Sequence, residues 1–213
     1  MLSEIASTSN RFGIYVHWPF CVSKCPYCDF NSHVNKDIDV TKWNQAYISE
    51  LHYMAKSYQE KAKNPGQVDS VFFGGGTPTL MPVSIIEEIL ETIDTLFPLA
   101  SNVEITAEAN PSSTETQKLA SFKSAGINRI SVGAQSLNPK TRHFLGRAHS
   151  NQDIYNALHA AMGLFNHVSA DFIYGMPEQT ASGWMDELDL IIQLGLSHIS
   201  AYQLTIEPGT QFY

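Results

Sequence analysis

Basic residues are scarce in this sequence. The chain has 13 Lys and Arg against 21 Asp and Glu in 213 residues, which gives a formal net charge of −8. The basic residues are scattered along the chain rather than clustered. Because the phosphate backbone of DNA or RNA attracts basic patches, this composition excludes a nucleic-acid partner. It also weighs against a stable contact with an anionic membrane surface.

Long apolar runs and paired cysteines are also missing. No apolar stretch approaches the roughly 18 residues that span a bilayer. The N-terminal segment MLSEIASTSN is neither cationic nor apolar, so we expect no signal peptide. The chain has 3 cysteines, all between Cys21 and Cys28. Since an odd number argues against a secreted, disulfide-bonded chain, we expect a cytoplasmic protein.

Short β-rich apolar runs alternate with longer segments of helical spacing, which is typical of parallel βαβ units. The predicted strands are Ile14–Trp18, Val68–Phe73, Val103–Ala107, Arg129–Val132, Val168–Ile173 and His198–Gln203. The predicted helices are Val40–Ala62, Val83–Leu96, Ser113–Ala125, Gln152–Phe165 and Ala181–Leu194. Pro82 suits the start of the second helix. Ser113 or Thr114 can cap the third helix, and Gly126 and Gly195 suit helix ends.

Polar and glycine-rich clusters follow nearly every predicted strand: the cysteine loop, GGGTP, EANP, GAQS and the segment Asp171–Pro177. In a barrel all these strand ends converge on one mouth, whereas a doubly wound sheet concentrates its chemistry at one switch point. We therefore predict an α/β fold, a partial (β/α)6 barrel. The chain stops at Tyr213, just after the sixth strand. We expect residues 1–213 to be an incomplete core domain whose C-terminal part is absent.

The cysteines form the motif Cys21-Val-Ser-Lys-Cys25-Pro-Tyr-Cys28. Three thiolates on one short loop suit one metal centre, and three ligands on a four-iron cluster leave one iron open. The alternatives are a zinc site completed by His17 or His33, and a disulfide. The aromatic residues around the cysteines are predicted to exclude water from the centre. They are Trp18, Phe20, Tyr27 and Phe30.

The spacing C-x3-C-x2-C resembles the signature of the radical S-adenosylmethionine superfamily. In that superfamily the open iron chelates the amino and carboxylate groups of S-adenosylmethionine. The reduced cluster then cleaves a carbon–sulfur bond to give a 5′-deoxyadenosyl radical. The resemblance implies a TIM-like barrel of the radical SAM type that is truncated after strand six, and makes residues 1–213 its core domain.

Candidate ligand-contacting residues lie at several strand ends. Glycines in Phe73-Gly-Gly-Gly-Thr-Pro78 let a backbone approach a ligand, although a tight turn alone also uses glycine. Glu108 can accept hydrogen bonds from a ribose diol or an ammonium group, or it is a solvated strand-end residue. Glu104, on the same strand and face, is expected to lie deeper or to be structural.

Three further side chains carry the same double interpretation, and a fourth, Gln135, is a candidate from its position alone. Arg147 can pair with a ligand carboxylate or lie on the surface. Asp171 can meet ribose hydroxyls or be an inward-facing structural aspartate. Tyr15 can contact the ligand or be a core tyrosine. Gln135 lies at the end of the fourth strand, where Gly133, which has no side chain, relieves crowding.

A closer resemblance rests on motifs that occur in order from Gly13 to Tyr213: Y-x-H-x-P-F-C, GGGTPT, EANP, GINRISVGAQS, LGRAHS, DFIYGMPEQT and YQLTIEPGT. They resemble the family of the oxygen-independent coproporphyrinogen III oxidases, which serve porphyrin biosynthesis, and their relatives. The decarboxylase branch has a fourth cysteine where this chain has Phe30, and a longer N-terminal arm. Both departures argue against decarboxylase activity, so whether the chain is an enzyme stays open. They match the HemW-type heme chaperones instead.

The resemblance implies a role for each matching residue. Cys21, Cys25 and Cys28 would hold a [4Fe-4S] cluster. The S-adenosylmethionine site would comprise Tyr15, Tyr27, Gly75, Gly76, Thr77, Glu108, Gln135, Arg147 and Asp171, with a backbone contact from Thr205. The implied partners are heme, heme-accepting respiratory proteins, an electron donor for the cluster and a transient contact with the membrane. The heme-contacting motif of the chaperone branch falls outside this chain.

Overall fold

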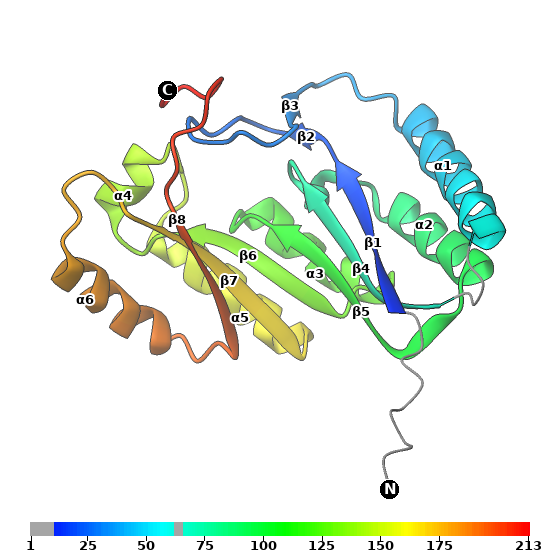
Figure 1. The fold of residues 1–213 in the computed structure, drawn as a ribbon. Coiled ribbons are helices and arrows are strands. Elements are labelled where there is room, and N and C mark those ends of the chain that lie inside the picture. Colours follow the sequence, from blue (N-terminus) through cyan, green and yellow to red (C-terminus); the bar gives the residue numbers. More distant parts are fainter. Residues whose placement is uncertain (1–10, 62–65) are drawn as a thin grey trace, which may run out of the picture.

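Six parallel strands form one sheet in the computed structural model of the chain, which describes residues 11–61 and 66–213. Their order across the sheet equals their order along the chain (Figure 1). The strands are β1 (Arg11–Trp18), β4 (Gln67–Gly75), β5 (Leu99–Ala109), β6 (Arg129–Gln135), β7 (His167–Tyr174) and β8 (His198–Gln203). Each predicted strand lies within one of these, so the predicted parallel sheet is confirmed.

The predicted helices are also present. They are α1 (Val40–Lys61), α2 (Val83–Leu96), α3 (Ser113–Ser124), α5 (Asn151–Leu164) and α6 (Ala181–Ile192). Four short elements were not predicted: β2 (Phe20–Cys21), β3 (His33–Val34), the 3-10 helix η1 (Pro78–Leu80) and α4 (Pro139–Phe144). The predicted end of the first helix, Ala62, lies outside the described residues. So does the segment 1–10, for which no signal peptide was expected.

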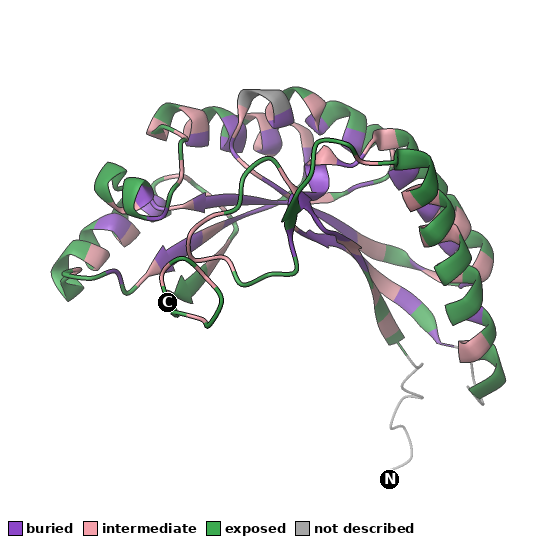
Figure 2. Ribbon diagram, turned by 90° about the horizontal axis from the view of Figure 1, so that it is seen from above, coloured by how far each residue is buried: buried purple, intermediate pink, exposed green. Residues whose placement is uncertain are grey.

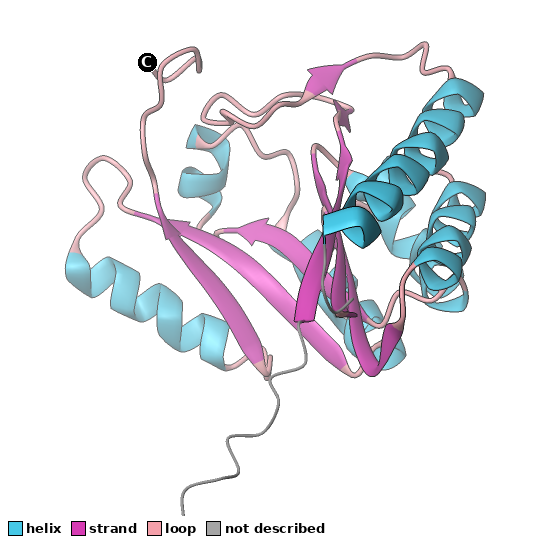
Figure 3. Cartoon of the chain, turned by 45° about the vertical axis from the view of Figure 1, so that its right-hand side comes forward, coloured by secondary structure: helices cyan, strands magenta, loops and turns pink. Residues whose placement is uncertain are grey.

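The sheet is curved, and the helices cover one of its two faces. Seen from above in Figure 2, the helices follow the convex side while the concave side carries no helix layer. Figure 3 shows the same open arrangement from the side. Since β1 and β8 each have one sheet neighbour, the sheet does not close. This half-barrel confirms the predicted partial (β/α)6 fold.

The hydrophobic core lies between the sheet and the helices. Helix α2 buries Ile85, Ile86, Ile89 and Ile93, which repeat at helical spacing and face the sheet. Side chains alternate along each strand, so Trp18 of β1 is in this core whereas Tyr15 lies on the concave face. Burying one such apolar side chain contributes about 1.5–3 kcal/mol. The core therefore leaves the concave face free for polar side chains.

The start of α3 differs from the prediction by one residue. Ser112, in extended conformation, is the N-cap, and its hydroxyl accepts a hydrogen bond from the Glu115 N–H at 3.2 Å. The prediction of Ser113 or Thr114 as the cap was wrong because the helical backbone already begins at Ser113. The predicted glycines at helix ends are confirmed: Gly126 and Gly195 have φ values of 112° and 72°. Among the described residues, no helix is long and apolar enough to cross a membrane.

Candidate functional site

The loops that follow the parallel strands meet at one end of the half-barrel. The cysteine loop crosses this end above the sheet (Figure 1). The glycine loop after β4 joins it directly: Gly76 N–H donates to Trp18 O at 2.7 Å and Thr77 N–H donates to Phe20 O at 2.9 Å. The predicted convergence of strand ends on one mouth is therefore present in the structure.

The cysteine loop is closed at its base by two short parallel strands. β2 pairs with β3, with Phe20 opposite His33. Within the loop, Cys28 N–H donates to Cys25 O at 3.1 Å. The Lys24 ammonium donates to the carbonyl oxygens of Phe30 and Ser32 at 3.2 and 3.3 Å. These bonds hold three free, partly exposed cysteines on one compact loop.

Each cysteine sulfur has its own hydrogen-bond partner. The Thr77 hydroxyl donates to Cys21 Sγ at 3.6 Å, and the Arg147 guanidinium donates to Cys25 Sγ at 3.3 Å. Ser32 Oγ lies 3.7 Å from Cys28 Sγ. Burial raises the pKa of the Cys21 thiol, and the hydrogen bond from Thr77 opposes that rise. Donors to sulfur stabilise thiolates, which are the form that binds iron.

The loop suits a bulky sulfur-ligated group. A Cβ atom at Gly76 would lie 2.7 Å from Phe20 O and 3.0 Å from Cys21 Sγ, so only glycine leaves this approach clear. The buried Arg147 Nε has no hydrogen-bond partner. Three soft thiolates are the donor set of iron–sulfur clusters, in which each thiolate binds a different iron. These features fit a [4Fe-4S] group held by Cys21, Cys25 and Cys28.

Across residues 11–61 and 66–213, no three His, Cys, Asp or Glu side chains gather to hold one metal ion. The two histidines weighed as zinc ligands contact Asn31 instead. His17 Nε2 lies 2.9 Å from Asn31 O, and His33 Nε2 lies 3.0 Å from Asn31 Oδ1.

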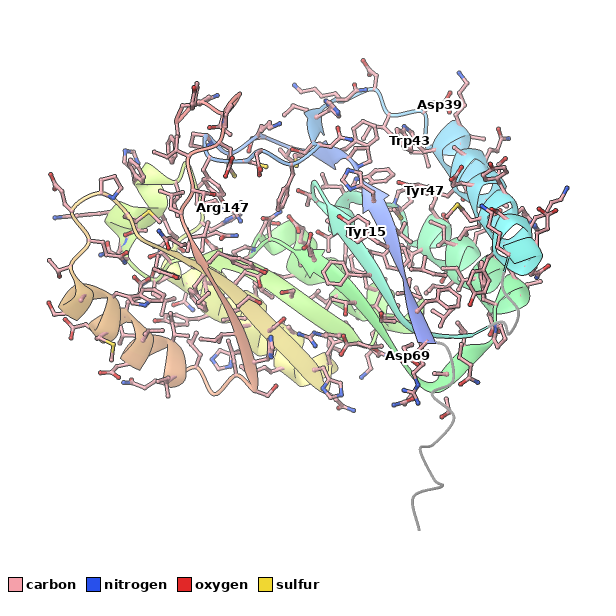
Figure 4. The ribbon with its side chains drawn as sticks, in the orientation of Figure 1. Tyr15, Asp39, Trp43, Tyr47, Asp69 and Arg147 are labelled. Carbon is pink, nitrogen blue, oxygen red and sulfur yellow. The ribbon has the colours of Figure 1, made fainter. Side chains whose placement is uncertain are left out.

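The predicted aromatic surround of the cysteines is present only in part. Trp18 and Phe20 are buried and form edge-to-face contacts with Trp43 of α1, which faces the sheet in Figure 4. Tyr27 lies beside Cys25 and packs near Phe212, and burial is the main cause that raises its pKa. Phe30 is 59% exposed and does not shield the cysteines, so that part of the prediction was wrong.

Crowding against β1 explains two glycines of the glycine loop. A Cβ atom at Gly74 would lie 2.8 Å from the Tyr15 ring, and one at Gly75 would lie 2.7 Å from the His17 ring. Gly75 also has a φ of 116°, which strains any other residue. The sequence allowed two interpretations of the glycine run, a tight turn and a close approach of the backbone to a ligand. The two are compatible, since the same glycines shape a tight turn and keep the backbone accessible.

Two carboxylates face each other across the concave side of the sheet. The pKa of Glu108 is raised to about 7, first by burial and second by the charge of Asp171, while a hydrogen bond from the Gly75 N–H lowers it. Glu108 is therefore not a freely solvated strand-end residue. Glu104, on the same strand, forms an ion pair with Arg129 at 3.1 Å, which agrees with a structural role.

Asp171 already has protein donors. The Ser131 hydroxyl lies 3.1 Å from both of its carboxylate oxygens, and Ser169 donates to Ser131 at 2.9 Å. Burial raises the pKa of Asp171, and hydrogen bonds from Ser200 and Ser131 oppose the rise. These contacts match the interpretation of an inward-facing structural aspartate, and they keep its carboxylate on the open side, near Glu108.

Tyr15 lies on the concave face and not in the core. Its side chain is 57% exposed, stacks on Phe72 with ring centroids 6.0 Å apart, and has its hydroxyl 3.3 Å from His17 Nδ1. Burial and the nearby charge of Glu108 both raise its pKa, burial more. The core interpretation was wrong because odd-numbered positions of β1 face away from the helices.

Arg147 is held at the mouth and is not a surface residue (Figure 4). Its guanidinium donates to Asn110 Oδ1 at 2.6 Å and to Gly133 O at 2.9 Å, besides Cys25. Gln135 has a φ of 66°, and a Cβ atom at Gly133 would lie only 2.8 Å from Gln135 Nε2. Thr205 lies in the exposed segment after β8. Asn110, which lies in the motif EANP, was not among the residues predicted from the sequence.

The sequence of this chain is similar to those of several known proteins. Residues 15–191 match the family model described as the Radical SAM superfamily. The chain is 37% identical over 201 residues to the heme chaperone HemW of Escherichia coli and 40% identical over 203 residues to that of Haemophilus influenzae. It is 36% identical over 209 residues to the mitochondrial radical S-adenosyl methionine domain-containing protein 1 of Bos taurus. These alignments cover 93%, 93% and 98% of this chain but 52%, 52% and 46% of the relatives.

A solved structure shares the fold over nearly the whole chain. Coproporphyrinogen III oxidase (HemN) from Escherichia coli, described as a radical SAM enzyme, superposes with a TM-score of 0.80 at 26% identity. The match covers 94% of this chain and 45% of that chain. The methyltransferase TsrM from Kitasatospora setae shares the fold alone, with a TM-score of 0.65 at 13% identity, over 96% of this chain and 38% of that chain.

The half-barrel, the cysteine loop at its mouth and the family match identify one class of protein. The chain belongs to the radical SAM superfamily. Within it, the chain is a member of the oxygen-independent coproporphyrinogen III oxidase family and belongs to the branch of the HemW-type chaperones. It spans about half the length of the curated relatives that it matches.

Proposed function

We propose that the full-length protein is a heme chaperone that binds a [4Fe-4S] cluster and S-adenosylmethionine and delivers heme to respiratory proteins. In this proposal Cys21, Cys25 and Cys28 each bind one iron of the cluster. When bound, the cluster supplies one-electron chemistry at its open iron. The observation that carries the cluster assignment is the set of three sulfurs on one loop, each with a separate hydrogen-bond partner.

The S-adenosylmethionine site is proposed along the carboxyl ends of the strands. The cofactor is cationic at its sulfonium and ammonium groups, and Glu108 and Asp171 lie on the concave face beside the loops. Arg147 offers an unpaired, buried Nε next to the cysteines, where a carboxylate can bind. The proposed set is Tyr15, Tyr27, Gly75, Gly76, Thr77, Glu108, Gln135, Arg147 and Asp171.

The chaperone assignment rests on Phe30 and on the relatives. Phe30 stands where the decarboxylase branch has a fourth cysteine, and its exposed side chain offers no thiolate. Sequence identity to HemW chaperones is 32–40%, against 26% to the structure of HemN. The fold similarity to HemN supports the second candidate, radical decarboxylation of coproporphyrinogen III to protoporphyrinogen IX.

One experiment separates the two candidates. The full-length protein is reconstituted with iron and sulfide under anaerobic conditions, and heme and coproporphyrinogen III are then added in separate samples. We expect stable heme binding and no decarboxylation. Formation of a vinyl product from coproporphyrinogen III, with S-adenosylmethionine and a reductant present, would refute the chaperone assignment in favour of the enzyme.

The remaining parts of the proposal concern location and partners. A reducing compartment keeps the three thiols free, and we propose the cytoplasm; relatives of the chain in animals are named mitochondrial proteins. An electron donor for the cluster, heme-accepting respiratory proteins and a transient contact with their membrane complete the proposed partners. Co-purification of a respiratory heme protein with the tagged full-length chain tests this part, and delivery of heme to an unrelated soluble protein contradicts it.

A further inference from the structure

One amide side chain joins the donors of two cysteine sulfurs. Thr77 donates to Cys21 Sγ and Arg147 donates to Cys25 Sγ, although the two residues belong to different loops. Asn110, which directly follows β5, lies between them. Its Nδ2 is 3.3 Å from Thr77 Oγ1, and its Oδ1 is 2.6 Å from the Arg147 guanidinium. The hydrogen bonds therefore run without interruption from one cysteine to the other.

The chemistry of the groups determines the direction of every bond in this chain. Arginine can only donate, so the amide oxygen of Asn110 must face Arg147 and its NH₂ group must face Thr77. A threonine hydroxyl has one hydrogen. Because Thr77 Oγ1 accepts from Asn110, its hydrogen is free to point at Cys21 Sγ. Asn110 thus directs one O–H donor and one N–H donor towards sulfur.

Asn110 is itself fixed by a buried carboxylate. Its backbone N–H donates to Glu115 Oε2 at 2.6 Å, and Glu115 is 6% exposed. Glu115 also accepts hydrogen bonds from Thr79 and from the Ser112 hydroxyl at the start of α3. The backbone of Asn110 is therefore anchored at the start of α3, while its side-chain amide bonds to Thr77 and Arg147.

We propose that Asn110 is a positioning residue for the cluster: it holds the donors of Cys21 and Cys25 in place and so raises the reduction potential of the cluster. This inference rests on the proposed cluster binding. Hydrogen bonds to ligand sulfurs stabilise the reduced, more negative cluster, and their loss shifts the potential to more negative values. Among the described side chains, Asn110 is the one that forms hydrogen bonds with both Thr77 and Arg147.

The test is a redox titration of the reconstituted cluster in the Asn110→Ala variant, followed by absorbance and electron paramagnetic resonance. Iron content is measured first, in wild type and variant. We expect full iron content and a negative shift of the midpoint potential. At the wild-type midpoint, the ratio of reduced to oxidised cluster should fall on the order of tenfold. Asn102→Ala, at an exposed position of β5, the strand that Asn110 follows, is the matched control and should keep the wild-type potential.

Further variants separate positioning from general damage. Thr77→Val, which replaces the hydroxyl with a methyl group, should also shift the potential negatively. Thr77→Ser keeps the hydroxyl and should keep the wild-type potential. Asn110→Asp has the same size but cannot donate to Thr77, and both this loss and its negative charge should lower the potential. Thr77→Val, which adds no charge, therefore decides the matter if Asn110→Ala loses its iron. A wild-type potential in Asn110→Asp and Thr77→Val overturns the inference. Absence of iron from the wild-type protein instead overturns the proposed function.

Discussion

Glu108 makes the stability of the chain depend on pH in a way that can be calculated. Its carboxyl is partly buried and faces Asp171, so its pKa is raised from the ordinary 4.5 to about 7. The folded chain therefore holds this proton more tightly than the unfolded chain. The unfolding free energy that Glu108 contributes is highest below pH 4.5, falls as the pH rises towards about 7, and then stays low.

The size of the effect follows from the shift. At pH 8 an ionised Glu108 destabilises the folded chain by about 3 kcal/mol, and at pH 5 by about 1 kcal/mol. Glu108→Gln replaces the carboxyl with an uncharged group of the same size. We expect urea unfolding to show the variant more stable than wild type by about 3 kcal/mol at pH 8, with most of this difference gone at pH 5.

Two controls make the measurement specific. Glu91→Gln, at an exposed position of α2, removes a carboxylate away from the concave face and should leave the pH dependence unchanged. Asp171→Asn removes the second cause of the shift, so it should lower the pKa of Glu108 and restore part of the stability at pH 8. If wild type and Glu108→Gln lose stability in parallel between pH 5 and pH 8, the reasoning is refuted.

Three further changes test other parts of the structure. Gly76→Ala places a Cβ 2.7 Å from a backbone oxygen of the cysteine loop, so it should destabilise the chain by about 2 kcal/mol in urea and reduce iron binding. Gly163→Ala, where a Cβ meets nothing within 4 Å in helix α5, is its control and should be neutral or stabilising. Glu187→Ala removes a buried hydrogen-bond acceptor and should lower the free energy of unfolding by about 3 kcal/mol. Asp186→Ala, at the exposed neighbouring position, should change it by no more than about 0.5 kcal/mol. Equal effects of the two variants contradict the structural role given to Glu187. Cys25→Ala should abolish the broad cluster absorbance near about 400 nm, and stoichiometric zinc without iron in the wild-type protein contradicts a cluster.

The strands and long helices could be predicted because local sequence determines them. Apolar runs flanked by glycine, proline or cap residues recur along the chain, and each corresponds to one element. The short elements carry no such signal. β2 and β3 have two residues each and exist only because the loop between them folds back. Periodicity cannot register an element of this length.

Helix α4 shows a different reason for failure. Its six residues follow a turn whose backbone N–H groups at Leu137 and Asn138 donate to Glu187 of α6. Ser136 donates to the same carboxylate at 2.5 Å. The acceptor is therefore supplied from about fifty residues further along the chain. A contact of this kind depends on the finished packing and leaves no mark in the local sequence.

The candidate site was predictable as a set of positions but not as a network. The cysteine spacing and the glycine run indicate where ligands bind. The role of Asn110 depends on three loops meeting in space, and the orientation of its amide depends on partners before and after it in sequence. Tyr15 was placed in two alternatives because strand alternation alone does not tell which face of β1 is buried. Both cases need the three-dimensional register of the strands.

The order of the strands has a consequence for biosynthesis. Because neighbours in the sheet are also neighbours along the chain, the half-barrel can assemble one βα unit after another as the ribosome extends it. The cysteine loop follows the first strand, whereas the donor to Cys25 comes 122 residues later. At a synthesis rate of about 5–20 residues per second, the thiols wait for roughly 6–25 seconds before Arg147 is made. Ser32 and Thr77, the partners of Cys28 and Cys21, are made earlier, so Cys25 is the cysteine that stays without its donor for the whole of this interval.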